Sequence, residues 1–524
     1  MERTTENICI INIDGEGRKK MMKYKNLLCN MILFAALAGN AESLNLKWNL
    51  CREAKLSEGR FLKFSVSPEN KSGQHCASAE FDLSSSADCM IEFSIRARAK
   101  NVSRPPQEWN GVKFMLHYRD SAGKDFWPGI RKFSGTFDWQ ELSFFALVGK
   151  PQGKAFLKLG LQDSSGEVEF DLASLRFHKL FSPPNRQFTA RYSDEIRATP
   201  PLRGMMSPAR NLTKDDFATL RSWNVNLVRA QIIRNWHKVG TDRDLEEFDR
   251  WINRKLDHFE TMFRIGYEQY GIRFVIDLHT YPGGRYANRE MAMFHETRYA
   301  EYFVELWKKI ALRFRNNPAV WGYGLINEPN QKRFARHDFE TLQKQAAEEI
   351  RKIDSTRPII IAANLSNSPD TFHLLKPVDL LNIIYEVHMY QPFQFTHQRV
   401  YSKDGKLRPG EKPVVYPGLI NGEEFDQKKL RQILQPVRDF QLRYGARIYV
   451  GEFSAITWAP GAAQYLHDLI EIFEDYHWDW SYHAFREASV WDVEKAGPDH
   501  RNIRPAPNTD RKQVLLEGFR KNRR

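Results

Sequence analysis

The feature that most constrains the fold is a regular alternation of apolar runs and amphipathic helical patterns after Pro201. Apolar runs of this length indicate buried strands, and hydrophobic residues at helical spacing between them indicate helices packed on a sheet. Strand–helix alternation predicts a parallel sheet, and eight such units suit a closed (β/α)8 barrel, the TIM-barrel fold. An open doubly wound sheet is the alternative, but no glycine-rich phosphate loop follows the first run. The eight runs are residues 202–206, 225–232, 272–279, 320–326, 358–363, 382–388, 446–451 and 478–485.

Two of the predicted helices have clear limits in the sequence. Thr213 is a favourable N-cap residue and acidic residues follow it in the first turn, so we expect a helix over residues 213–223. A second helical pattern extends over residues 244–270. Both lie between predicted strands, as a barrel requires.

Residues 42–180 follow a different pattern, in which short segments of period two are separated by turn residues. Runs of this kind predict an all-β sandwich, and the region resembles the jelly-roll carbohydrate-binding modules that often precede secreted glycosidases. Trp109, Trp127 and Trp139 are candidate platforms for sugar rings, and packing in the core is the alternative role of each. The clearest alternating runs are residues 90–97, 112–118, 155–161 and 168–172.

The N-terminal segment, residues 1–41, has the pattern of an extension and a signal peptide. Basic residues at 23 and 25 precede an apolar run over 27–38, and small residues follow it. We therefore expect a secreted protein, extracellular or periplasmic, with Met21 or Met22 as a candidate start. The mature chain contains no further apolar run of about 18 residues, so no membrane span is predicted. Residues 181–201 contain two Pro-Pro pairs, which indicates a linker or an extended segment that packs on the barrel domain. The barrel domain is predicted over residues 202–524.

Composition excludes several classes of function. The formal net charge is +13, but basic and acidic residues are mixed and no Lys/Arg block or nucleic-acid motif is present, so no nucleic-acid partner is expected. Of five cysteines, only Cys51, Cys76 and Cys89 would remain after removal of the signal peptide, which permits one intramolecular disulfide at most. There is no Cys/His metal spacing and no nucleotide fingerprint, so neither a metal nor a cofactor is predicted.

Polar side chains close the apolar runs of the predicted barrel. In a (β/α)8 barrel the carboxyl ends of all eight strands meet at one mouth, where the chemistry of such proteins takes place. A single polar residue at such a position could be a satisfied core group, but a set of them at successive strand ends is difficult to explain by packing. The set is Arg229, His279, Asn327, Glu328, His388, Tyr390 and Glu452.

Two glutamates, Glu328 and Glu452, end the fourth and seventh runs. Two carboxyl groups on opposite sides of the barrel mouth are the catalytic groups that most glycoside hydrolases use. One carboxyl, kept protonated by partial burial, donates a proton to the leaving oxygen, and the other attacks the anomeric carbon as a carboxylate. Arg229 could keep the nucleophile ionised through its charge and its hydrogen bonds.

The ordered motifs of residues 198–500 resemble glycoside hydrolase family five, the cellulase family in the retaining clan of (β/α)8 enzymes. The resemblance implies that Glu328 is the acid/base, that Glu452 is the nucleophile, and that Asn327 binds the sugar 2-hydroxyl. It also implies that His279, His388 and Tyr390 shape the same subsite. The motifs are Arg229 on the second strand, Asp277-Leu278-His279 with Tyr281-Pro282-Gly283-Gly284, Leu325-Ile326-Asn327-Glu328-Pro329, His388-Met389-Tyr390 and Gly451-Glu452-Phe453.

The sequence departs from the family at the last strand, where a Trp platform is expected and His483 falls near that position. Trp480, Phe485 and Trp491 are candidates for the platform, and Glu487 is a further carboxylate nearby. We expect a monomeric hydrolase of β-glucan, with β-mannan or a short oligosaccharide as the alternative substrate. A protein of another class, which binds glycans without cleaving them, is the second alternative.

Overall fold

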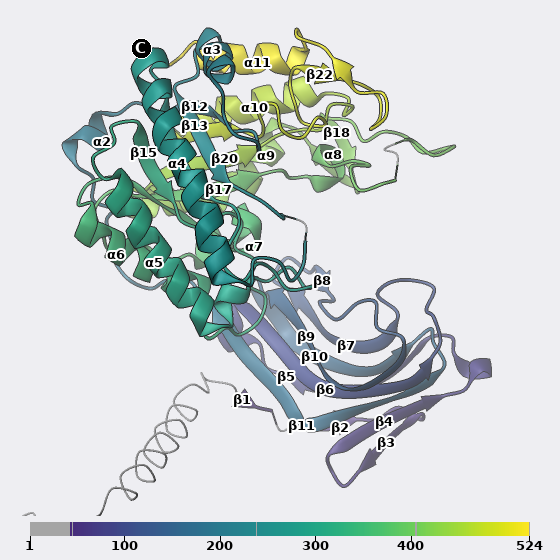
Figure 1. The fold of residues 1–524 in the computed structure, drawn as a ribbon. Coiled ribbons are helices and arrows are strands. Elements are labelled where there is room, and N and C mark those ends of the chain that lie inside the picture. Colours follow the sequence, from purple (N-terminus) through teal and green to yellow (C-terminus); the bar gives the residue numbers. More distant parts are fainter. Residues whose placement is uncertain (1–41, 45, 237, 404–405, 523–524) are drawn as a thin grey trace, which may run out of the picture.

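The computed structural model describes residues 42–44, 46–236, 238–403 and 406–522, and these form two bodies, a β-sandwich and a barrel (Figure 1). The predicted signal peptide and Cys9 and Cys29 lie outside the described residues. Cys51, Cys76 and Cys89 are free thiols. Among the described residues, no helix is both long enough and apolar enough to cross a membrane.

The N-terminal body consists of two antiparallel sheets packed face to face, as the period-two pattern predicted. Side chains of alternating strand residues from both sheets form its core, among them Phe64, Phe93, Phe114 and Leu159. One sheet contains β1 (Glu42–Ser43), β3 (Ala54–Ser57), β4 (Phe61–Val66), β6 (Met90–Val102), β9 (Gly135–Leu147) and β11 (Gly166–Phe181); the other contains β2 (Trp48–Asn49), β5 (Gln74–Phe81), β7 (Gly111–Asp120), β8 (Asp125–Phe126) and β10 (Pro151–Gln162).

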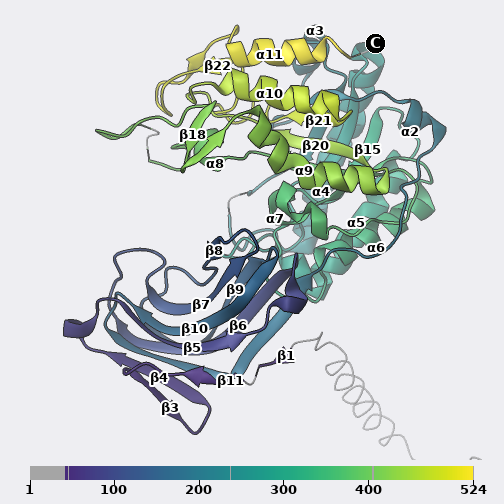
Figure 2. The ribbon, with the colours of Figure 1, turned by 180° about the vertical axis from the view of Figure 1, so that it is seen from behind.

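The C-terminal body is a closed barrel of eight parallel strands, so the predicted (β/α)8 fold is confirmed. All eight predicted strands form, and the last pairs with the first, which closes the barrel. The helices surround the strands (Figures 1 and 2). The strands are β12 (Arg203–Met206), β13 (Leu227–Ile232), β14 (Arg273–Leu278), β15 (Val320–Gly324), β16 (Ile359–Ala362), β17 (Ile383–Met389), β20 (Arg447–Phe453) and β21 (Asp479–Tyr482).

Most connections between barrel strands contain a long amphipathic helix. Thr213 is the N-cap of α3, as predicted, and it forms a capping box with Asp216. The connection from β16 to β17 differs, since it contains only the short α7 (Asn364–Asn367) and a 3-10 turn over Pro369–Leu374. The long helices are α3 (Lys214–Ser222), α4 (Leu245–Tyr270), α5 (Thr297–Phe314), α6 (Phe339–Ile353), α9 (Gln427–Tyr444), α10 (Ala462–Asp475) and α11 (Asp510–Phe519).

Three additions complete the chain. The insert that follows β17 carries α8 (Phe393–Thr396) and the hairpin β18 (Gly418–Ile420) and β19 (Glu423–Phe425). A second small hairpin, β22 (Lys495–Ala496) with β23 (Arg504–Pro505), follows β21. Between the two bodies, residues 182–202 contain α2 (Asp194–Ala198) and lie against the barrel, where Tyr192 donates a hydrogen bond to the Ile383 carbonyl.

The interior of the barrel is built in layers, and these layers place the polar site. An apolar layer includes Leu227, Val275 and Ile384. Side chains two residues further along a strand point in the same direction, so Arg229, Asp277 and Glu386 form a charged layer on top of the apolar one. The site therefore rests on a packed apolar floor.

Candidate active site

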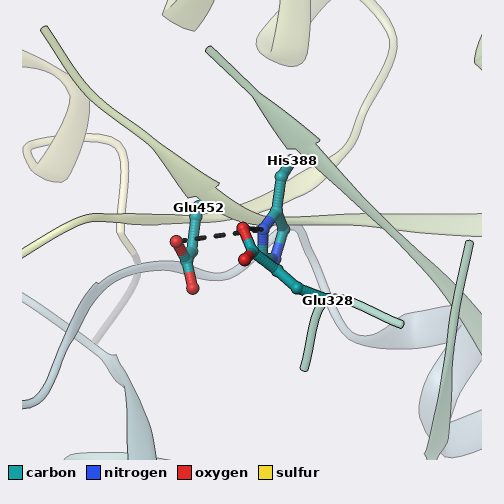
Figure 3. A group of neighbouring side chains, drawn as sticks. All are labelled: Glu328, His388 and Glu452. Carbon is teal, nitrogen blue, oxygen red and sulfur yellow. Dashed lines mark hydrogen bonds and ion pairs between the residues drawn. The ribbon is translucent and has the colours of Figure 1, made fainter. Parts of the chain in front are cut away.

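A pocket of about 350 Å³ opens at the carboxyl ends of the barrel strands. Glu328, His388 and Glu452 converge in it from three different strands or the loops that follow them (Figure 3). The position agrees with the rule that barrel chemistry takes place at this end.

Glu452 is aimed into the pocket by a bulge in β20. The pairing of β17 with β20 shifts between Val387 and His388, so Gly451 is the extra residue. Only glycine fits there, because a Cβ on residue 451 would lie 1.7 Å from Glu386 Oε1. The bulge therefore turns Glu452 towards the mouth.

The Glu452 carboxylate is buried and held by two strong donors. Arg229 Nη1 donates to its Oε1 at 2.7 Å, and the Tyr390 hydroxyl donates to its Oε2 at 2.8 Å. Burial alone raises the pKa of Glu452, but the nearby charges of His388, His483, Arg229 and His279 outweigh it and hold the pKa below its ordinary value. Glu452 is thus an ionised carboxylate, as a nucleophile must be.

Arg229 is the centre of the charged layer and is fully buried. Its Nη2 lies 2.9 Å from Asp277 Oδ1 and 2.9 Å from Glu386 Oε1, and donates to Asn327 Oδ1 at 2.8 Å. One cation therefore fixes the side chains of four strands or strand ends. Burial alone lowers the pKa of Arg229, but Asp277, Glu386 and Glu452 keep it raised, so the guanidinium stays charged.

Glu328 follows β15 and adopts a left-handed backbone conformation, with φ of 48°. A non-glycine residue in this region is uncommon and is often found at functional sites. Its side chain is 21% exposed, compared with 6% for Glu452, so it is the more open of the two carboxyl groups. His388 Nδ1 lies 3.2 Å from its Oε1.

The two histidines are oriented by buried carboxylates. His279 Nδ1 is hydrogen-bonded to Asp277, while its Nε2 lies 3.6 Å from Glu452 Oε1. His388 Nε2 lies 3.2 Å from Glu386 Oε1, which leaves Nδ1 for Glu328. Burial lowers the pKa of His388, but Glu452, Glu328 and Glu386 together raise it, so His388 is a cation beside both carboxyl groups.

Asn327 presents a hydrogen-bond donor to the pocket. Its side-chain oxygen accepts from Arg229, and its Nδ2 has no hydrogen-bond partner among the described residues although it is buried. A buried donor without a partner is costly, and a ligand hydroxyl would satisfy it.

The separation of the two carboxyl groups indicates the type of reaction. One ligand atom each of Glu328, His388 and Glu452 lies within 4.8 Å of the others. Retaining glycosidases hold their carboxyl groups about 5–5.5 Å apart, whereas inverting enzymes need room for a water molecule. Binding of a metal ion by Glu328, His388 and Glu452 is disfavoured, because both Glu452 oxygens already accept hydrogen bonds from Arg229 and Tyr390.

The structure brings together most of the residues that the sequence predicted. Trp480 is an exception and the prediction for it is wrong: it lies at the start of β21, fully buried, and stacks on Phe519 of α11 at 5.2 Å. Its position in the strand directs it to the helix layer, away from the mouth. Phe485 is also buried and packs against Trp223. The predicted residues that line the pocket are His279, Asn327, Glu328, His388, Tyr390, Glu452 and Trp491, with Arg229 beneath them.

His483 occupies the wall at which an aromatic platform was expected. Its Nε2 lies 3.6 Å from Glu487 Oε2, and Glu487 accepts a hydrogen bond from Gln231 at 2.9 Å. This wall is polar, apart from the ring of Trp491, whose centroid is 5.4 Å from that of His483. Glu487 thus pairs with a histidine and an amide.

Sequence reasoning missed several residues of the site. Glu386 stands in the middle of an apolar run and has the same parity as His388, which is a signal that could have identified it. The aromatic residues of the insert, Phe393, His397 and Tyr401, also line the pocket. Their position depends on how a long loop folds, and no periodic pattern indicates it.

The three tryptophans of the sandwich differ in their surroundings. Trp127 stacks on His117 with ring centroids 3.5 Å apart. The Trp139 ring is covered by Arg98 at 4.9 Å. Trp109 is 52% exposed. None of the three belongs to the catalytic pocket.

A (β/α)8 barrel with two carboxyl groups this close at its mouth has the architecture of a retaining glycosidase. Residues 193–489, more than half of the chain, match the cellulase family, glycosyl hydrolase family 5. The chain therefore belongs to this family of retaining glycoside hydrolases.

Individual relatives are more distant. The chain is 29% identical to Endoglucanase C of Acetivibrio thermocellus over 231 residues, which is 40% of this chain and 66% of that protein, slightly less than two thirds. It is 25% identical to Cellodextrinase A of Ruminococcus flavefaciens over 246 residues, 46% of this chain and 68% of the relative. Among solved structures, Thermotoga maritima Cel5A in complex with cellobiose is 22% identical, with a TM-score of 0.46 over 61% of this chain and 97% of that one.

Proposed function

We propose that the protein is a secreted β-glucan hydrolase that retains anomeric configuration through a double displacement. The observation that carries the proposal is the close pair of Glu328 and Glu452, of which one is open and the other is buried beside Arg229. The two environments suit two different roles on one substrate.

In the first step, Glu452 attacks the anomeric carbon while Glu328 donates its proton to the departing glycosidic oxygen. Arg229 and Tyr390 hold the nucleophile in place and keep it ionised. The His388 cation lies within 3.8 Å of Glu452 Oε2 and stabilises this carboxylate before the attack.

In the second step, Glu328, now a carboxylate, removes a proton from water, and the resulting hydroxide attacks the glycosyl–Glu452 ester. The ester breaks, the sugar leaves with its original configuration, and both carboxyl groups return to their initial states. The unpartnered Nδ2 of Asn327 is suited to the sugar 2-hydroxyl during both steps.

Support for a β-glucan substrate comes from the relatives, which include an endoglucanase and a cellodextrinase. A β-mannan or a short oligosaccharide remains the alternative within the family. Secretion rests on the N-terminal sequence pattern alone.

A substrate screen with product stereochemistry tests the proposal. The wild type is assayed on cellulose, mixed-linkage β-glucan, β-mannan and aryl glycosides, and the anomer first formed is identified by NMR. We expect hydrolysis of β-glucan with retention, and a loss of at least about a thousandfold in kcat for Glu452→Gln. Inversion, or full activity of this variant, would reject the mechanism. Binding without any hydrolysis would favour a glycan-binding protein.

A further inference from the structure

The segment that follows Glu328 must hold this residue in an unfavourable backbone conformation. A residue with φ of 48° persists only when its surroundings fix it. The chain therefore needs anchors close to Glu328, and residues 329–334 supply them.

Neighbouring loops of the barrel anchor the first part of this segment. Ser366 N donates to the Pro329 carbonyl at 3.0 Å. The Asn364 side chain accepts from Gln331 N and donates to the Gln331 carbonyl, both at 2.9 Å. Buried Glu290 then accepts from the next two backbone N–H groups, those of Lys332 and Arg333.

The sandwich anchors the end of the same segment. Phe334 N donates to Glu92 Oε2 at 2.7 Å, and Glu92 is only 3% exposed although it lies on β6 of the other body. The Phe334 ring stacks on His178 of β11, with centroids 5.1 Å apart. Both ribbon views place the sandwich strands beside α7, where Met90 Sδ lies 3.8 Å from Asn364 Nδ2 (Figures 1 and 2).

These contacts reach the back of the catalytic loops. The opposite face of these loops forms part of the pocket wall, which includes Glu328, Leu365, Ser366 and Ser368. Three consecutive backbone N–H groups, those of residues 332–334, are thus held by two buried carboxyl groups, of which one comes from the sandwich. A loop bound in this way has few alternative conformations.

We propose that Glu92 is a positioning residue for the acid/base Glu328, so that the sandwich completes the active site. The inference rests on the proposed function, since it assumes that Glu328 protonates the leaving group. Glu92 does not touch substrate; it acts through the backbone of Phe334 and the segment that leads back to Glu328.

The test compares substrates that need the acid to different degrees. A cello-oligosaccharide has a poor leaving group and requires protonation, whereas 2,4-dinitrophenyl β-cellobioside has a leaving group that departs without it. For Glu92→Ala in the full chain we expect kcat/KM on the oligosaccharide to fall about tenfold, and on the aryl glycoside to change by less than about twofold. The ratio of the two values does not depend on the fraction of folded protein.

Two further variants serve as controls. Glu92→Gln keeps an oxygen that accepts from Phe334 N, so we expect it to restore the wild-type ratio. Glu141→Gln makes the same chemical change at an exposed residue of β9, and we expect no change of the ratio.

The measured ratios distinguish a positioning role of Glu92 from a purely structural role. An equal fall on both substrates for Glu92→Ala, or no fall on either, would overturn the positioning role. Glu328→Gln separately tests the proposed function: it must depress kcat/KM on the oligosaccharide far more than on the aryl glycoside. If Glu328→Gln leaves the ratio unchanged, the proposed function fails, whatever Glu92→Ala shows.

Discussion

At the scale of single residues, the buried Glu452 illustrates how a carboxylate is kept ionised inside a protein. Desolvation opposes its charge, and the charges of Arg229 and the surrounding histidines more than compensate. Tyr390 contributes a hydrogen bond to the second oxygen. Burial raises the pKa of Tyr390 itself, so its hydroxyl keeps its proton and remains a donor.

Removal of this hydroxyl gives a testable prediction. Tyr390→Phe deletes the 2.8 Å hydrogen bond to Glu452 Oε2 and leaves the ring in place. A hydrogen bond to a charged group contributes about 1.5–3 kcal/mol, so we expect kcat to fall by about 10- to 100-fold with a smaller effect on KM. Steady-state kinetics on a β-glucan measure both constants. An unchanged kcat would show that Arg229 alone is sufficient to hold the nucleophile.

The location of the site could be predicted because strand ends in a barrel share one location, and the structure brings the seven predicted polar residues together there. Trp480 could not be placed, since whether a residue of a short strand faces the mouth or the helices depends on its register. The bulge at Gly451 was also hidden, although it decides where Glu452 points. Register and bulges are set by pairing with distant strands, which sequence periodicity does not report.

At the scale of elements, the eight strands were predictable because each is an apolar run with helical patterns on either side. The connection from β16 to β17 was not, since Leu365 and Ser366 adopt left-handed conformations that their side chains do not favour. The loop that contains them forms part of the pocket. Elements that line the site are therefore those in which local sequence preference is least informative.

The insert after β17 forms an aromatic wall at the pocket rim. Phe393 is 52% exposed and Tyr401 is 84% exposed, and His397 lies between them, with ring centroids 4.9 and 6.3 Å away. Burial lowers the pKa of His397 to about 4, so its ring is neutral at ordinary pH. Exposed rings beside a sugar-sized pocket are suited to stacking on further sugar units.

We therefore expect Tyr401→Ala to weaken binding of long substrates. The loss of one stacking ring is worth about 0.5–1.5 kcal/mol, which corresponds to a rise in KM of about two- to tenfold on a long cello-oligosaccharide. The KM for a short aryl glucoside, which does not extend to the rim, should be unchanged. Leu419→Ala, on the exposed hairpin of the same insert, is the matched control, with no effect on either substrate. Equal effects on long and short substrates would exclude a rim site.

At the scale of the whole molecule, the sandwich and the barrel share an interface that contains an ionisable group. Burial raises the pKa of Glu92 to about 7, despite the lowering effect of the Phe334 amide and of Arg333. Glu141 and Glu290 add to the rise. His178 stacks on Phe334 next to Glu92, and burial lowers its pKa, so it supplies little positive charge at neutral pH.

The raised pKa has a defined consequence for stability. The unfolded chain releases the Glu92 proton near its ordinary value of 4.5, whereas the folded chain retains it up to about pH 7. Between these values the native state binds more protons, so the contribution of Glu92 to stability falls as the pH rises, by a total of about 3 kcal/mol. Below about pH 4.5 the protonated Glu92 makes its full contribution to stability.

The matched variant isolates this effect from all other titrating groups. Glu92→Gln keeps the acceptor for Phe334 N and cannot ionise. Between about pH 5 and about pH 8 the Tm of the wild type should therefore fall by a few degrees relative to the Tm of Glu92→Gln. Thermal unfolding across this pH range measures the difference. Glu141→Gln removes one of the charges that raise the pKa of Glu92, so this variant should lose less stability than the wild type over the same pH range. If the difference is constant with pH, Glu92 does not retain its proton at the interface, and its carboxylate is stabilised there by Arg333 instead.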